Sequence, residues 1–93
     1  MKEEIYLTSL YDYYKGLLTD KQRDYFEDYY FDNLSLSEIG ENNGISRNAV
    51  SSQLLKIKEK LYEYESVLNL YKNKEQIEKI LDEETIKKIE DFI

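Results

Sequence analysis

The stretch SLSEIGENNGISRNAVSSQLLKIKEKL, residues 35–61, decides the fold of this chain, because its small, turn and apolar residues follow one another at specific spacings. Ser35 and Glu38 have the spacing of a capping box, in which each side chain accepts a hydrogen bond from a free backbone N–H of the other residue at a helix start. Gly40 has no Cβ, so a second helix could cross closely against its face. These residues predict a short helix that begins at Ser35.

A turn and a second helix follow in the same register. Gly44 can take the left-handed conformation that ends a helix, Ile45 can then point back to the core, and Ser46 can cap a helix that starts with Arg47. The apolar residues of this helix recur at i, i+4, i+7 and i+11 and must face the core: Val50, Leu54, Ile57 and Leu61. An ordinary helical hairpin can also contain such a turn, but all these features in one ungapped register favour a helix-turn-helix.

The residues of the second helix that lie off the apolar stripe are candidates to contact nucleic acid. We expect two of them, Arg47 and Asn48, to reach base edges. Four others would hold phosphates: Ser46, Ser51, Ser52 and Lys56. The motif therefore indicates nucleic-acid recognition rather than catalysis.

The composition favours one all-α domain without catalytic machinery. Ninety-three residues allow a single small domain, 1–93, with the motif at 35–61 and a helical extension at about 62–93. The chain has no cysteine and no histidine, which removes disulfides, thiol nucleophiles, Ser-His-Asp triads and the usual zinc ligands. It has no proline and three glycines, so almost every segment can be helical. We expect an all-α protein that is not an enzyme and has no cofactor.

The charge and hydropathy patterns bear on location and partners. No run approaches the roughly 20 apolar residues that span a bilayer, so we expect a cytoplasmic protein without membrane contact. The net charge is −7, yet residues 35–61 carry four basic and three acidic residues, whereas residues 1–34 carry four and eight and residues 62–93 carry five and nine. DNA contact would thus be weak per monomer. The acidic flanks are solvated helix faces or a docking surface for a basic partner.

Two further helices are expected before the motif. Apolar and aromatic residues recur at helical spacing in a first helix that ends near residues 16–18: Ile5, Tyr6, Leu10, Tyr13, Tyr14, Leu17 and Leu18. Thr19 and Gln22 form another capping box, which opens a helix that packs by its rings. Those rings are Tyr25, Phe26, Tyr29 and Tyr30. Tyrosines can also stack on unpaired bases, but their helical spacing beside leucine and phenylalanine favours use in the core.

The second helix of the motif is expected to run beyond it. Its apolar residues continue to alternate by four and three as far as Tyr71, which predicts one helix from about Ser46 to about Lys72. Either the N-terminal helices or a second copy would cover its far half. Leu55 and Tyr62, seven residues apart on a different side, form a second apolar stripe and are our candidates for a homodimer interface.

Two short amphipathic helices are expected after Asn73. Their apolar residues and the cap between them are Ile77, Ile80, Leu81, Asp82, Ile86, Ile89 and Phe92.

The run LYDYYKGLLTDKQRDYFEDYYFDNLSLSEIGENNGISRNAV, residues 10–50, with the later Glu63-Tyr64-Glu65, resembles the YlxM family of small bacterial helix-turn-helix proteins, which are similar to region 4 of sigma-70 factors. The resemblance covers most of residues 5–72. Its matching pieces are LLT-x-KQ at 17–22, YY-x-D at 29–32, SL-x-EI at 35–39 and SR-x-AV at 46–50. It implies a DNA-binding regulatory protein whose gene tends to lie beside those of the signal recognition particle, with an accessory role in that targeting pathway.

Carried over residue by residue, the resemblance supports part of the recognition helix. The first positions of the recognition helix match the family pattern: Ser46, Arg47, Ala49 and Val50. The following positions depart from the pattern of Tyr, Asp, Asn and a Lys-Arg pair, with one cation fewer and a gain of leucine: Ser51, Ser52, Gln53, Leu55 and Lys56. Two hypotheses follow, a DNA-binding regulator and an accessory protein that binds the RNA or the GTPase of the signal recognition particle. A helix-turn-helix fold alone does not decide between them.

Overall fold

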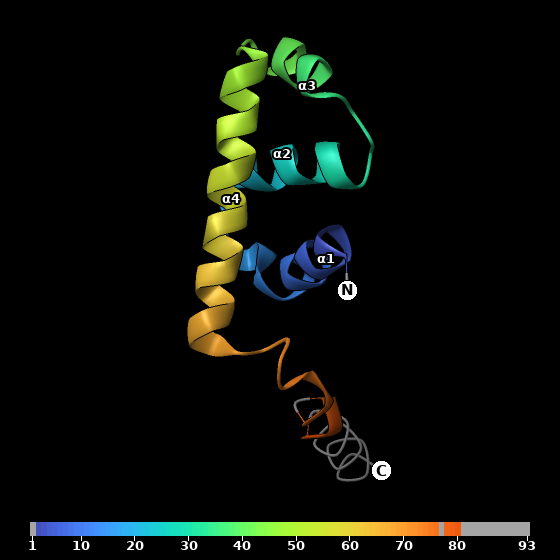
Figure 1. Ribbon diagram of the computed structural model, residues 1–93, viewed down its shortest axis with the longest axis vertical. Coiled ribbons are helices and arrows are strands. Elements are labelled where there is room, and N and C mark those ends of the chain that lie inside the picture. Colours follow the sequence, from blue (N-terminus) through green and yellow to red (C-terminus); the bar gives the residue numbers. More distant parts are fainter. Residues whose placement is uncertain (1, 77, 81–93) are drawn as a thin grey trace, which may run out of the picture.

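The computed structural model describes residues 2–76 and 78–80, and the regular structure of these residues is helical. Figure 1 shows α4 as a long upright helix, with the other helices arranged along one side of it. The elements in chain order are α1 (Glu3–Tyr14), the short 3₁₀ helix η1 (Lys15–Leu17), α2 (Asp20–Tyr30), α3 (Leu36–Asn43) and α4 (Arg47–Leu68). The all-α prediction is confirmed. No helix within the described residues is both long and apolar enough to cross a bilayer.

The predicted helix starts are confirmed in atomic detail. The Thr19 hydroxyl accepts a hydrogen bond from the Gln22 amide at 3.1 Å, and the Gln22 side chain accepts one from the Thr19 amide at 2.9 Å. Ser35 and Glu38 form the same reciprocal pair at the start of α3, at 3.1 and 3.2 Å. Each box satisfies two of the backbone donors that a helix start leaves free. The starts of α2 and α3 are therefore local properties of the sequence.

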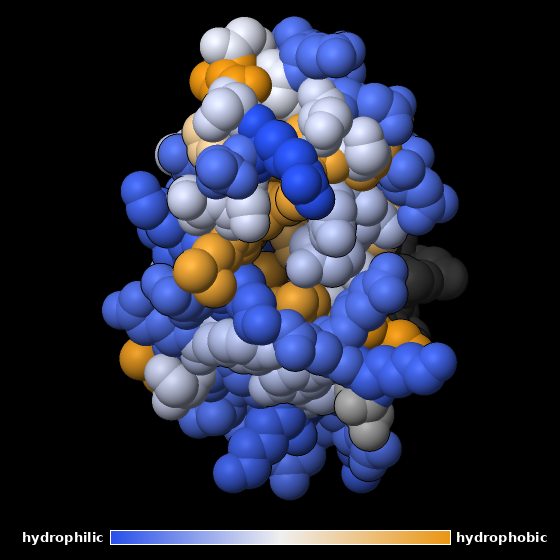
Figure 2. Space-filling view, turned by 45° about the horizontal axis from the view of Figure 1, so that its top comes forward, coloured by the Kyte–Doolittle hydropathy of each residue, from blue (hydrophilic) through white to orange (hydrophobic). Residues whose placement is uncertain are grey.

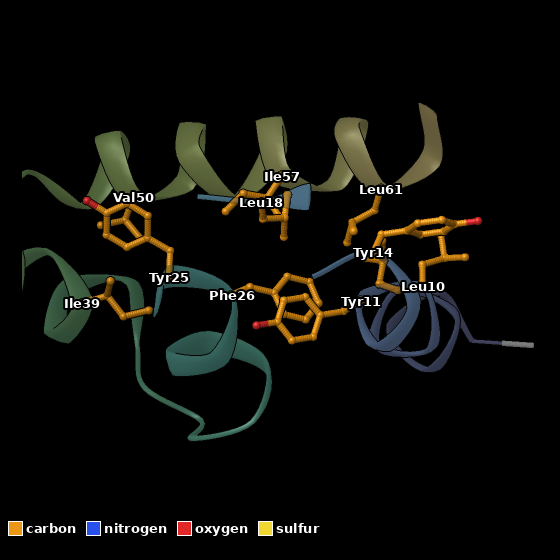
Figure 3. Packing of buried hydrophobic residues seen from close by; sticks show 11 residues of the cluster. Leu10, Tyr11, Tyr14, Leu18, Tyr25, Phe26, Ile39, Val50, Ile57 and Leu61 are labelled. Carbon is orange, nitrogen blue, oxygen red and sulfur yellow. The ribbon is translucent and has the colours of Figure 1, made fainter. Parts of the chain in front are cut away.

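A single core joins the four α-helices. Its buried residues are Leu7, Leu10, Tyr11, Tyr14, Leu18, Tyr25, Phe26, Ile39, Val50, Ile57 and Leu61. Figure 3 shows them filling the space between α4 and the shorter helices. The rings of Tyr11 on α1 and Phe26 on α2 stack with centroids 4.3 Å apart, so α2 packs by its rings as predicted. An aromatic ring buries a large apolar area, so Tyr11 and Phe26 supply much of the small core.

The predicted apolar stripe of α1 is only partly correct. Leu7 and Tyr11, which it left out, are buried, whereas Ile5 and Leu17 are more than half exposed. Helix α1 carries leucines and tyrosines on several sides, so periodicity alone does not select the buried face. The packing of α1 against α2 and α4 determines which of its faces is buried.

The prediction that the apolar seam continues to Tyr71 in one helix is wrong. Helix α4 ends at Leu68, Asn69 takes a left-handed φ of 54°, and Leu68 is 48% exposed. The residue that follows Leu61 on the core-facing side is Glu65, which is only 8% exposed. A carboxylate in this position needs several hydrogen-bond donors, and the chain provides them by turning back.

Glu65 ties the end of α4 to α1. Its Oε1 accepts hydrogen bonds from the Tyr14 hydroxyl at 2.6 Å and the Tyr71 amide at 3.1 Å, and its Oε2 accepts one from the Lys72 amide at 3.0 Å. The Leu70 amide donates to the Tyr14 hydroxyl at 3.0 Å. Burial, and then the hydrogen bond to Glu65, raise the pKa of Tyr14 to about 12. Of the two alternatives for the far half of α4, packing by α1 of the same chain is the one observed.

The two C-terminal helices expected after Asn73 fall mostly outside the described residues. This applies to Ile77, Leu81, Asp82, Ile86, Ile89 and Phe92. Ile80 is described, and its side chain is exposed.

We expect Gly40→Ala to destabilise the protein by about 1–3 kcal/mol. A Cβ at this position would lie 2.6 Å from the backbone oxygen of Ile45, whose amide already donates a hydrogen bond to the Gly40 carbonyl at 3.0 Å. Urea denaturation measures the effect. Gly16→Ala is the matched control, because a Cβ there meets open space. Equal midpoints for the two variants would contradict this account of α3 and α4.

We expect Glu65→Gln to cost about 1–3 kcal/mol, because a side-chain NH₂ would replace one acceptor oxygen and face a backbone N–H. The control is Glu63→Gln, a change of the same chemistry at an exposed position of the same helix. Thermal or urea unfolding of both variants distinguishes them. An unfolding free energy that falls equally in the two variants would show that the buried hydrogen bonds are not its source.

Candidate nucleic-acid interface

The turn between α3 and α4 has the geometry that a helix-turn-helix requires. Gly44 has a φ of 68°, in the left-handed region that glycine adopts without steric cost, so this prediction is confirmed. The Ser46 hydroxyl accepts a hydrogen bond from the Ala49 amide at 3.0 Å and caps α4. Ile39 on α3 and Val50 on α4 are both fully buried. The start of α4 is thereby held rigidly, with one side against α3 and the other toward solvent.

Two rows of exposed side chains run along the free side of this helix start. Asn48, Ser52 and Lys56 are spaced by four residues, so they lie above one another on α4. The neighbouring row consists of Arg47, Ser51 and Leu55 at the same spacing. All six side chains are exposed. Asn48, Ser51 and Ser52 adjoin one another on this free side. Arg47 and Lys56 are nine residues apart, so they project to opposite sides of the helix at the edges of the two rows. The sixth predicted residue, Ser46, is the helix cap.

Figure 2 looks obliquely onto the end of the molecule that contains α3 and the start of α4. Polar side chains cover most of this face, and apolar side chains appear between them as separate small patches. A surface of this kind suits the phosphates and base edges of a duplex, which offer hydrogen-bonding partners.

The cations of this region differ from those counted along the sequence. Lys58 belongs to residues 35–61, but its ammonium group forms an ion pair with Glu3 of α1. The hydrogen bond that it donates to Glu3 raises the pKa of Lys58. Lys21 of α2 instead reaches the end of α3, where it donates to the Asn43 side chain. Lys21 was missed because it is 22 residues distant from its partner in the sequence, and no local pattern marks it. The cations on or next to the exposed rows are Arg47, Lys56 and the half-buried Lys60, which follows Lys56 by one turn. Lys21 adds a cation beside the end of α3.

The two residues proposed for a homodimer interface have different surroundings. Leu55 is 54% exposed. The ring of Tyr62 is half-buried, stacks on Tyr6 with centroids 5.9 Å apart, and lies 6.0 Å below the ammonium group of Lys58. Part of the stripe is thus used inside the chain. The structure contains one copy of the protein, and the homodimer stays a prediction.

The comparisons with known proteins agree with this geometry. A family model described as "Putative helix-turn-helix protein, YlxM / p13 like" (UPF0122) matches residues 1–92. The chain belongs to this family. The resemblance inferred from the motifs is confirmed, and it extends over nearly the whole chain rather than over residues 5–72 alone.

Three relatives illustrate the similarity. A UPF0122 protein of Ureaplasma parvum serovar 3 is 47% identical over 91 residues, which cover 94% of this chain and 92% of the relative. A UPF0122 protein of Fusobacterium nucleatum is 38% identical over 81 residues, covering 87% and 79%. One from Caldanaerobacter subterraneus is 42% identical over 78 residues, covering 84% and 67%. These names assign membership of the family and no activity.

Proposed function

We propose that this protein is a DNA-binding regulator that places the start of α4 in the major groove. The observation that carries the proposal is the pair of exposed rows on α4, held in place by the Gly44 turn and the buried contact with α3. An α-helix with its side chains is about 10–12 Å across, and the major groove is about 12 Å wide. The free side of α4 can therefore approach base edges while α3 lies near the backbone.

The residues of the two rows have separate roles in this proposal. Arg47 can donate two hydrogen bonds to guanine, and Asn48 can both donate to and accept from adenine. Four other side chains are suited to phosphate oxygens, which fix the position of the helix but carry no sequence information. These are Ser46, Ser51, Ser52 and Lys56.

Electrostatics limit the affinity of a single copy. Each neutralised phosphate contributes separately to binding. The cations near the rows are few: Arg47, Lys56 and Lys60 on α4, and Lys21 beside the end of α3. The net charge of −7 opposes approach to a duplex. We therefore expect random duplex DNA to bind weakly at physiological salt, at or beyond the weak end of roughly 10⁻⁴–10⁻⁶ M.

We expect sequence selection from random duplex DNA at low salt to enrich a defined site. For that site, Arg47→Ala should cost about 1–3 kcal/mol of binding free energy and relax selectivity at one position, whereas Lys56→Ala should weaken all duplexes alike. Lys72→Ala is the control, because it removes an exposed cation that lies beyond the far end of α4. Binding curves at several salt concentrations separate these effects.

Two results would count against the DNA proposal or its details. Absence of any enriched sequence would remove the regulator as the leading function. Enrichment that survives Arg47→Ala would keep the function but reject Arg47 as the residue that reads the bases.

A second candidate function is an accessory protein that binds the signal recognition particle through its RNA or its GTPase. The departures from the family pattern favour it, since Leu55 replaces a polar position within one of the exposed rows. Residues 1–34 and 62–93 also carry more acidic than basic residues. Affinity capture from native lysate, with and without nuclease, tests this role. Recovery of the particle's GTPase after nuclease treatment would support it, and recovery of neither RNA nor GTPase would reject it.

A further inference from the structure

Two hollows next to each other form a groove on one flank of the molecule, which we call the flank groove. They share Tyr29 and Tyr30 at the end of α2. One hollow, of about 460 Å³, extends to Glu3 and Glu4 at the start of α1. The other, of about 200 Å³, extends to Leu36, Leu54 and Leu55 beside the recognition rows. The groove therefore connects the start of α1 with the flank of α4.

The middle of the flank groove is apolar and accessible. Leu55 is 54% exposed and Tyr29 is 38% exposed. Leu36, Leu54 and Tyr30 lie beside them and are half-buried. Ser51 and Lys58 complete the lining of this hollow, and the charge of Lys58 is offset by its ion pair with Glu3. Single exposed apolar residues are ordinary on a protein surface, but several that line one hollow are typical of an interaction site. Leu55 has no role in contacting DNA in the proposed function, although it follows Arg47 and Ser51 in one row.

The α1 end of the flank groove is acidic. Glu3 and Glu4 line it, and Glu3 already forms the ion pair with Lys58. Lys58 offsets the charge of Glu3, whereas Glu4 is an exposed carboxylate at the same end of the groove. A partner that brings positive charge would be attracted to this end.

The negative charge of the groove also argues against a segment of this chain, or a second copy of it, as the molecule that binds there. Residues 81–93 carry five acidic and two basic residues, so this segment is acidic overall. A second copy has a net charge of −7. Like charges that face each other in an interface cost free energy. Charge complementarity therefore favours a basic molecule.

We propose that the flank groove binds a basic amphipathic helix of another protein. Leucine or isoleucine side chains of that helix would contact Tyr29 and Leu55, and its lysines or arginines would lie against Glu3 and Glu4. This is an interaction beyond DNA binding and does not depend on it. The site lies beside Ser51, so the partner would sit next to the recognition rows.

The probe for this site is a fluorescently labelled amphipathic peptide of leucine and lysine, roughly 14 residues or four helical turns long. A peptide of leucine and glutamate with the same pattern is its control. Both are titrated against the full-length protein, and the binding surface is mapped from the amide NMR spectrum. We expect the lysine peptide to bind and to shift the amides around Tyr29 and Leu55, whereas the glutamate peptide should not bind.

Three variants separate the contributions. Leu55→Gln removes an apolar contact, and Glu4→Gln removes a negative charge. Each change should lower the affinity of the protein for the lysine peptide about tenfold, or by about 1.4 kcal/mol. Val67→Gln is the matched control, because Val67 is an apolar residue of the same helix that is 73% exposed and lies outside the groove. All three changes are at exposed positions, so the fold should be kept, as circular dichroism would verify.

Several results would overturn the proposal. These are equal binding of the two peptides, shifts confined to other surfaces, and affinities that the Leu55 and Glu4 changes leave unaltered. A dimer in sedimentation that Leu55→Gln dissociates and Val67→Gln does not would assign the groove to a second copy instead. Arg47→Ala should leave peptide binding unchanged, so a failure of the DNA proposal is distinguishable from a failure of this one.

Discussion

Burial of one side of α4 is the constraint on which the rest of the structure depends. Val50, Ile57 and Leu61 are fully buried along that side, in the first two thirds of the helix. Figure 3 shows Val50 at the α3 end of the core and Leu61 at the α1 end. A helix of 22 residues gains little stability from its own hydrogen bonds, since tertiary packing of an apolar face supplies most of it. The three shorter helices supply that packing.

The same constraint determines which residues are free to act. Because the buried side of α4 is fixed, the opposite side presents Asn48, Ser52 and Lys56 at regular spacing. Arg47 and Ser51 lie between that side and α2 and α3. The candidate DNA-binding surface is therefore a consequence of how the core is built. Its rigidity follows from the close approach of Gly40 to Ile45, which leaves no room for a side chain between α3 and the turn.

The two proposals assign partners of two kinds to different surfaces of the molecule. A short polar surface with a few cations suits a duplex, although the acidic body opposes non-specific attraction. The acidic, apolar flank groove suits a basic protein segment. These two surfaces adjoin at Ser51 and Leu55, which are neighbours on α4. Recognition of DNA and recognition of a protein would then share one helix without sharing residues that read bases.

The sequence by itself determined the features whose partners are within a few residues. The capping boxes at Thr19 and Ser35, the left-handed Gly44 and the cap at Ser46 were all predictable, because each is satisfied by hydrogen bonds or backbone geometry inside one turn. The order of the first four helices followed from them. The family resemblance carried by these motifs was correct for the same reason.

Only the tertiary structure decided the features that join distant residues. Glu65 meets Tyr14 across 51 residues, which ends α4 earlier than its apolar pattern predicted. Lys58 is neutralised by Glu3, and Tyr62 stacks on Tyr6, so neither is as free as the sequence indicated. Periodicity shows which residues share a face of a helix but not what that face meets. The packing of α1 against α4 determines what the far half of α4 contacts.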